Sequence, residues 1–310
     1  MTDAERIAKL ELPGPDACPR VVLDTDTYNE VDDQFAVAYA VRSAQAGQLR
    51  LEGIYAAPCV NTFYPTAAEG MEMSYQEILK VMERLHYPEG PALARRGSDR
   101  KLTETDGAPC DSPAARDLIS RAMNSDETLY VVAIGAGTNI ASALLLEPLI
   151  KEKIVLIWLA GNAPHWPHIR EYNVCQDLRA AQIIFSSGVP LILMPAYNVV
   201  SHMLTTTYEI DHFLAGKSEI GSYLAGIVHE YASRAAENAE PGYAWSKVIW
   251  DVVGIAVLLC PDAVQTSLTH TPILTDDLHW ASDSSRPLMR VGEYVRRDPI
   301  FTDVFRKLAL

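Results

Sequence analysis

The chain has 310 residues, of which 48% are hydrophobic and 21% are charged, as in an ordinary globular enzyme. Its formal net charge is −14, and a negative surface repels both nucleic-acid phosphates and anionic membranes. These values argue against a nucleic acid or a membrane as partner, and leave a small ligand in a local pocket possible.

The cysteines and the N-terminal residues indicate the compartment. The five cysteines are scattered and form no CxxC pair, so we expect reduced thiols and neither a disulfide framework nor a zinc site. Residues 1–19 mix charges with proline and lack an apolar signal-peptide core, and no apolar run reaches about 20 residues. We therefore expect a soluble, cytoplasmic protein whose residues 1–19 form a loosely ordered extension.

Short apolar runs and helical stretches alternate along the chain. The runs that predict buried parallel strands are residues 20–25, 51–57, 129–135, 154–161 and 189–196. The stretches that predict helices are residues 31–47, 68–86, 138–150 and 178–188, and Gly47 and Gly188 would cap two of them.

The remaining segments complete the predicted fold. Residues 87–116 are predicted as a long loop, residues 208–260 as a cluster of helices, and the tail from residue 264 as strand and a closing helix. The alternation indicates an α/β fold: a mainly parallel, Rossmann-like sheet with helices on both faces. Because we find no repeat and no linker, we expect residues 1–310 to form a single domain.

Five carboxylates lie within ten residues directly after the first predicted strand: Asp24, Asp26, Glu30, Asp32 and Asp33. In an open α/β sheet, ligands bind outside the carboxyl ends of the strands, where this segment lies. Like charges this close repel one another unless protons or a cation offset them, and a dense set of oxygen ligands favours Ca²⁺ or Mg²⁺ over zinc. The alternative is a solvated acidic loop whose aspartates cap the next helix.

This segment differs from one known calcium-binding motif and shares letters with two other motifs. An EF-hand does not fit, because the sixth position from Asp24 is Asn29 rather than glycine and the twelfth is Phe35 rather than glutamate. The letters "LDTDT" match the DxDxT motif of the haloacid-dehalogenase-type phosphatases, with Asp24 as nucleophile. The Asp-x-Asp followed by Asp-Asp at a helix start also resembles the opening of the nucleoside hydrolases.

Three later motifs resemble the nucleoside hydrolases in the order that this family requires. "VVAIGAGTNIASAL" resembles a strand followed by Thr-Asn and a helix, here Thr138 and Asn139. "EYNVCQDLRAA" resembles the family's Glu-aromatic-Asn loop, and "VIWDVVGIAVLL" resembles the late helix with its metal-binding aspartate, Asp251. We see no downstream lysine and second acidic motif of the phosphatase kind, so that reading becomes the alternative.

The resemblance implies a calcium ion, in preference to magnesium, at the base of a ribose pocket. Its ligands would be the carboxylates of Asp26, Asp33 and Asp251 and the backbone carbonyl of Thr138. The residues implied to contact the ribose are Asp32, Asn61, Glu171 at the 5′-hydroxyl and Asn173 at the 3′-hydroxyl. Members of the family are commonly homodimers or homotetramers.

The resemblance also implies the reaction, which is hydrolysis of the N-glycosidic bond of a ribonucleoside to free base and ribose. Such a cleavage passes through an oxocarbenium-like sugar, and anionic groups stabilise it. A metal lowers the pKa of its bound water, and Asp26 would remove the proton as the water attacks.

Two departures from the family pattern concern the same site. Five residues, 27–31, separate Asp26 from Asp32 where the family usually has three. The residue before Asp251 is Trp250, where the branch acting on inosine and uridine often has an acidic histidine. Trp250 would stack on the base or pack in the core, and His165 is a candidate donor to the departing base. A relative that binds nucleosides without turnover is therefore a further alternative.

Overall fold

The computed structural model describes residues 1–14, 17–237, 240 and 243–310. Its largest sheet has eight strands in the order β3-β2-β1-β4-β5-β6-β12-β9. Their bounds are β1 Arg20–Thr25, β2 Arg50–Ala56, β3 Ala94–Arg96, β4 Leu129–Ala133, β5 Ile154–Leu159, β6 Leu191–Met194, β9 Val264–His270 and β12 Leu288–Val295. Neighbouring strands are parallel except for β9, which runs antiparallel to β12 at one edge.

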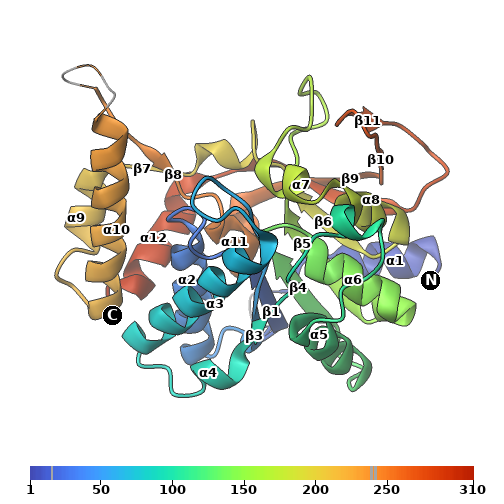
Figure 1. The fold of residues 1–310 in the computed structure, drawn as a ribbon, viewed down its shortest axis with the longest axis horizontal. Coiled ribbons are helices and arrows are strands. Elements are labelled where there is room, and N and C mark those ends of the chain that lie inside the picture. Colours follow the sequence, from blue (N-terminus) through green and yellow to red (C-terminus); the bar gives the residue numbers. More distant parts are fainter. Residues whose placement is uncertain (15–16, 238–239, 241–242) are drawn as a thin grey trace.

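Helices cover both faces of this sheet (Figure 1). On the face of Val21 and Leu23, the core includes side chains of α2 (Asp33–Gln45), α3 (Ala67–Arg84), α10 (Glu219–Ala236), α11 (Val252–Leu259) and α12 (Arg297–Leu308). On the opposite face, marked by Val22, it includes α5 (Pro113–Met123), α6 (Thr138–Leu146) and α8 (Leu178–Ser187). Successive strand residues point to opposite faces, so a strand buried on both sides is apolar throughout.

Short elements complete the fold. Two-residue strands form two further pairs, β7 (Leu204–Thr205) with β8 (Lys247–Val248) and β10 (Ile273–Leu274) with β11 (Trp280–Ala281). The remaining helices are α1 Asp3–Leu10, α4 Gly90–Leu93, α7 Tyr172–Gln176, α9 Thr207–Phe213 and the 3₁₀ turns Leu102–Thr105, Pro148–Glu152, Val200–His202 and Pro261–Ala263. Within the described ranges, no helix combines the length and apolar character that crossing a membrane requires.

The predicted α/β architecture is confirmed. Each of the five predicted strands and four predicted helices is present, and Gly188 ends α8 with a φ of 75°. The segment predicted as a loop, 87–116, also contains α4, β3 and the start of α5. Within residues 208–260, predicted as a cluster of helices, residues 247–248 instead form a strand that pairs with β7, and α11 begins only at Val252.

The N-terminal residues differ from the loose extension that we expected over residues 1–19. Residues 3–10 form α1, which begins with a capping box between Thr2 and Glu5. Leu10 is fully buried, and Arg6 donates a hydrogen bond to the carbonyl of Gly188 at 2.6 Å. Burial of Leu10 and this long-range bond fix the helix against the domain.

Candidate metal and ribose site

A pocket of about 190 Å³ lies at the carboxyl ends of the central strands. Acidic residues and their neighbours form one part of its wall: Asp26, Asn29, Glu30, Asp32, Asp33 and Asp251. The other part consists of Ile134, Leu159, Arg170, Glu171, Tyr172, Asn173, Ala196, Tyr197 and Trp250. This is the position that ligands occupy in open parallel sheets.

Three buried carboxylates converge in this pocket. One carboxylate oxygen from each of Asp32, Asp33 and Asp251 lies within 4.8 Å of the others. Asp26 lines the same pocket, and its buried Oδ2 has no hydrogen-bond partner among the described residues. A buried polar atom without a partner is costly, so this arrangement suits a bound cation or a hydrogen-bond donor of a ligand.

Two helix N-termini hold the carboxylates. Asp32 is the N-cap of α2 and Asp33 its first residue, while Asp251 is the N-cap of α11. Thr25 Oγ1 donates to Asp33 Oδ1 at 2.6 Å, and the backbone amide of Trp250 donates to Asp32 Oδ2 at 3.1 Å. The positive ends of the helix dipoles stabilise negative charge here, and this offsets part of the repulsion.

The surroundings of the clustered aspartates disfavour their ionised forms. Burial, followed by the charge of Asp33, holds the pKa of Asp26 well above its ordinary value. Burial and the neighbouring aspartates raise the pKa of Asp33 and of Asp251 in the same way. For Asp32 burial also raises the pKa, but the ammonium of Lys247 opposes that rise. A cation with two or more charges would therefore favour the ionised cluster.

The donor set fits a hard divalent cation. Its donors are carboxylate oxygens, which Ca²⁺ and Mg²⁺ prefer. Gly135, just after β4, provides the space: a Cβ built there would lie 2.7 Å from Asp26 Oδ1. The backbone at the end of β4 thus approaches Asp26 as closely as only glycine allows.

Glu171 and Asn173 are held rigidly on the opposite wall. Glu171 caps α7: its Oε1 accepts from the amide of Asn173 at 2.9 Å, and its Oε2 accepts from Gly161 at 2.9 Å and Val174 at 3.1 Å. Burial raises the pKa of Glu171 to about 7, and these amide donors oppose the rise. Asn173 Nδ2 donates to the carbonyls of Ile134 and Leu159, both at 2.9 Å.

Three residues predicted at the site, Asn61, Thr138 and His165, lie outside the pocket wall. The hydroxyl of Thr138 donates to Asp177 at 2.8 Å, at the buried start of α6. Ile134 at the end of β4 lines the pocket in its place. Asn61 bonds Asn29 at 3.2 Å and the amides of Phe63 and Tyr64, and so braces a loop rather than the pocket itself.

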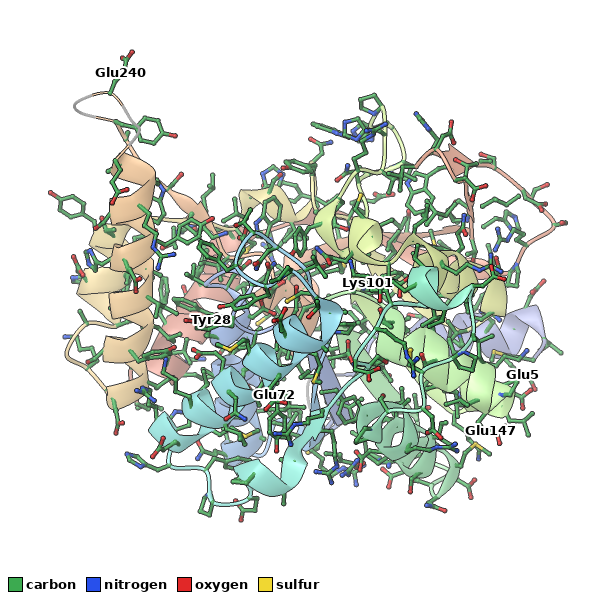
Figure 2. The ribbon with its side chains drawn as sticks, in the orientation of Figure 1. Glu5, Tyr28, Glu72, Lys101, Glu147 and Glu240 are labelled. Carbon is green, nitrogen blue, oxygen red and sulfur yellow. The ribbon has the colours of Figure 1, made fainter. Side chains whose placement is uncertain are left out.

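Contacts of Tyr28, Asn29 and Glu30 hold the longer connector between Asp26 and Asp32 in place. Tyr28 has a φ of 105°, a strained conformation for a side-chain-bearing residue, and its ring lies 5.9 Å from that of Tyr64 (Figure 2 labels Tyr28). Asn29 Oδ1 accepts from Asn61 and from the hydroxyl of Tyr172. Glu30 forms an ion pair with Lys247. The extra length therefore brings Asn29 and Glu30 into the pocket wall.

Aromatic rings form a row from the loop at 164–168 to the pocket. Trp166 stacks on Tyr197 with ring centroids 5.7 Å apart, and Tyr197 meets Trp250 edge-on, also at 5.7 Å. Trp250 and Tyr197 line the pocket, whereas the exposed His165 does not and is bonded to Asn198 at 2.7 Å. Sequence reasoning missed Tyr197 and Arg170, because neither belongs to a recognisable motif.

Asp24, the nucleophile of the alternative phosphatase reading, lies behind the pocket. It is fully buried in β1, and its Oδ2 accepts from Asn139 Nδ2 at 2.8 Å. Asn139 in turn accepts from the amide and hydroxyl of Ser98. Since Asp24 is absent from the pocket wall, its position does not suit a nucleophile.

Comparison with known proteins agrees with this geometry. The chain is 30% identical over 156 residues to the pyrimidine-specific ribonucleoside hydrolase RihB of Escherichia coli K12, a match that covers 49% of each chain. It thus spans about half the length of the curated relatives it matches. Among solved structures, a purine-preferring ribonucleoside hydrolase from Gardnerella vaginalis superposes with a TM-score of 0.74 at 22% identity, covering 94% of this chain and 98% of the other.

A plant nucleoside hydrolase, PpNRh1, has the same fold, with a TM-score of 0.74 and 20% identity over 94% of this chain and 99% of its own. The family described as inosine-uridine preferring nucleoside hydrolase matches residues 21–298, nearly the whole chain. The motifs that suggested this family from the sequence lie within the matched region. The chain therefore belongs to the inosine-uridine preferring nucleoside hydrolase family.

Proposed function

We propose that this protein hydrolyses the N-glycosidic bond of a ribonucleoside with the help of a bound Ca²⁺ ion. The observation that carries the proposal is the buried cluster of Asp32, Asp33 and Asp251 beside the unpartnered Oδ2 of Asp26. Family membership supports the reaction class, and RihB and the Gardnerella enzyme are both named as ribonucleoside hydrolases.

The residues that would hold the ion are Asp26, Asp33 and Asp251, with the backbone carbonyl of Ile134 a better candidate than that of Thr138. When bound, the ion would supply electrophilic activation of water and of the ribose hydroxyls. Asp26 would accept the proton of the attacking water. The remaining carboxylates would stabilise the positive charge that develops on the sugar.

The opposite wall would bind the rest of the substrate. Asp32, Glu171 and Asn173 would orient the ribose hydroxyls, and Trp250 with Tyr197 would stack on the base. The described residues that line the pocket include no histidine, so protonation of the leaving base by His165 would need that loop to move. We also propose a homodimer or homotetramer, to be measured by light scattering.

The test is a panel of purine and pyrimidine ribonucleosides, assayed for reducing ribose with Ca²⁺, with Mg²⁺ and with a chelator. We expect release from at least one nucleoside, lost on chelation and restored best by Ca²⁺. Asp26→Asn should abolish it, whereas Asp126→Asn on the exposed surface should not. Absence of release from every nucleoside by the Ca²⁺-loaded protein would exclude the hydrolase, and calorimetric nucleoside binding would then identify a non-catalytic relative.

A further inference from the structure

Lys247 lies beside the acidic cluster without belonging to any of the family motifs. It belongs to β8, which pairs with β7, and it precedes Asp251 by four residues. Its side chain is only 9% exposed. The ammonium forms an ion pair with Glu30 Oε2 and lies 3.9 Å from Asp32 Oδ1. It also lies 5.3 Å from the ring centroid of Tyr231. A buried ammonium in such a setting is held in one place.

The ion pair with Lys247 holds the carboxylate of Glu30 in place. Glu30 belongs to the connector that is longer than the family's usual one, and it lines the same pocket as Asp33 and Asp251. The side chain is 40% exposed, and among the described residues Lys247 is its one ion-pair partner, so this ion pair fixes it on the wall. A glutamate released here would be an additional oxygen ligand within the pocket of a divalent cation.

We propose that Lys247 is a positioning residue that holds the Glu30 carboxylate on the pocket wall, away from the ion, and so leaves coordination positions open for the ribose hydroxyls. The effect on KM rests on the proposed function. The effect on Ca²⁺ affinity rests only on the ion pair between Lys247 and Glu30.

Measured Ca²⁺ affinities can distinguish this positioning role from direct repulsion between the Lys247 ammonium and the ion. Loss of the ammonium in Lys247→Met should tighten Ca²⁺ binding roughly tenfold, because Glu30 joins the ligands. In the Glu30→Gln background, the same lysine change should tighten Ca²⁺ binding by a smaller factor, about threefold, because only the loss of a nearby positive charge then acts. If Lys247 acted only through its charge, the two backgrounds would show the same tightening. Titration calorimetry on the four substrate-free proteins measures this cycle.

Turnover provides the second readout. Lys247→Met should raise the KM for the best ribonucleoside roughly tenfold with a smaller change in kcat, because ribose then competes with Glu30. Glu30→Gln added to it should restore the KM, and Lys247→Arg should leave it near the wild-type value. Lys153→Met removes a lysine from the surface ion pair with Asp126 and is the matched control.

The outcomes distinguish the two proposals. Equal tightening in both backgrounds, or a KM that Glu30→Gln does not restore, would overturn the role of Lys247. If the wild type binds Ca²⁺ but hydrolyses no nucleoside, the proposed function fails while the calorimetric cycle still tests the lysine. Thermal melting checks that each variant folds, and Lys247→Gln replaces Lys247→Met in the cycle if the latter does not.

Discussion

The backbone amide of Trp250 donates a hydrogen bond to Asp32 Oδ2 at 3.1 Å and joins two residues that are 218 positions apart. This bond brings the N-cap of α11, Asp251, against the start of α2. The candidate ion site is therefore assembled from the two ends of one long stretch of chain, and each end contributes a carboxylate on a helix N-terminus.

Removing the late carboxylate should abolish most ion binding. We expect Asp251→Asn to weaken Ca²⁺ binding roughly 100-fold, because affinity in oxygen-ligand sites follows the number of charged ligands. Hydrolysis at limiting Ca²⁺ should fall in proportion. Titration calorimetry measures the affinity, and Asp262→Asn, an exposed carboxylate just beyond α11, is the control that should change nothing.

The close approach at Gly135 predicts a steric effect on the proposed base. Gly135→Ala places a Cβ 2.7 Å from Asp26 Oδ1 and 3.0 Å from the Cβ of Ala57, so Asp26 must shift. Misplacement of a reacting group by about 1 Å costs on the order of 100-fold in rate, so we expect kcat to fall by about that factor. Gly226→Ala in α10 meets nothing within 4 Å and should leave kcat unchanged. An unaltered rate in Gly135→Ala would remove Asp26 from its proposed role.

The aromatic row predicts where the base binds. Stacking on an aromatic side chain contributes about 1–3 kcal/mol per base, so Trp250→Ala should raise KM roughly 5- to 150-fold. Tyr197→Ala should raise it less, because Tyr197 meets Trp250 edge-on at the rim. Steady-state kinetics measures both, and Trp250→Phe should recover most of the loss. If KM is unchanged in Trp250→Ala, that ring packs only against the protein.

Asp24 predicts a dependence of stability on pH. Burial raises its pKa from 3.8 to about 7, and the bond from Asn139 opposes the rise. Because the folded state holds this proton more tightly than the unfolded state, the stabilisation is complete below about pH 4. It is lost as pH rises towards 7.

The variant Asp24→Asn isolates this contribution, since an amide mimics the protonated acid. The free energy of unfolding of the wild type, relative to Asp24→Asn, should fall by up to about 1.4 kcal/mol per pH unit between pH 4 and 7. Urea unfolding of the chelated protein at several pH values measures it. Parallel curves for the two proteins would show that Asp24 keeps an ordinary pKa.

The sheet could be predicted because strands buried on both faces must be apolar throughout, and five such runs stand out from the sequence. The edge strand β3 could not, since its three residues, Ala94–Arg96, include two arginines and carry no such pattern. The helix α1 had a usable signal in its Thr2-Asp3-Ala4-Glu5 capping box, which composition alone concealed.

The candidate site also contains residues that the sequence pointed to and residues that it did not. Residues in sequence motifs with side-chain chemistry, such as Asp33, Glu171 and Asp251, do line the pocket. The sequence did not point to Ile134, which lines the pocket and whose carbonyl we propose as an ion ligand, because a backbone carbonyl can come from any residue type. Only the end point of β4 decides which residue faces the pocket. Lys247 was missed because its partner, Glu30, lies far away in the chain.

The convergence of α2 and α11 gives ion binding a mechanical consequence. Asp33 and Asp251, if both held the proposed ion, would be joined by a removable cross-link that closes the loop between them, and closing so long a loop restricts the unfolded chain strongly. Local opening between α11 and α2 would then be rarer when calcium is bound. The backbone amides of residues 252–259 would therefore exchange their hydrogens far more slowly with calcium than without it. The ion proposed for the reaction would therefore also hold the late helix α11 against α2, early in the chain.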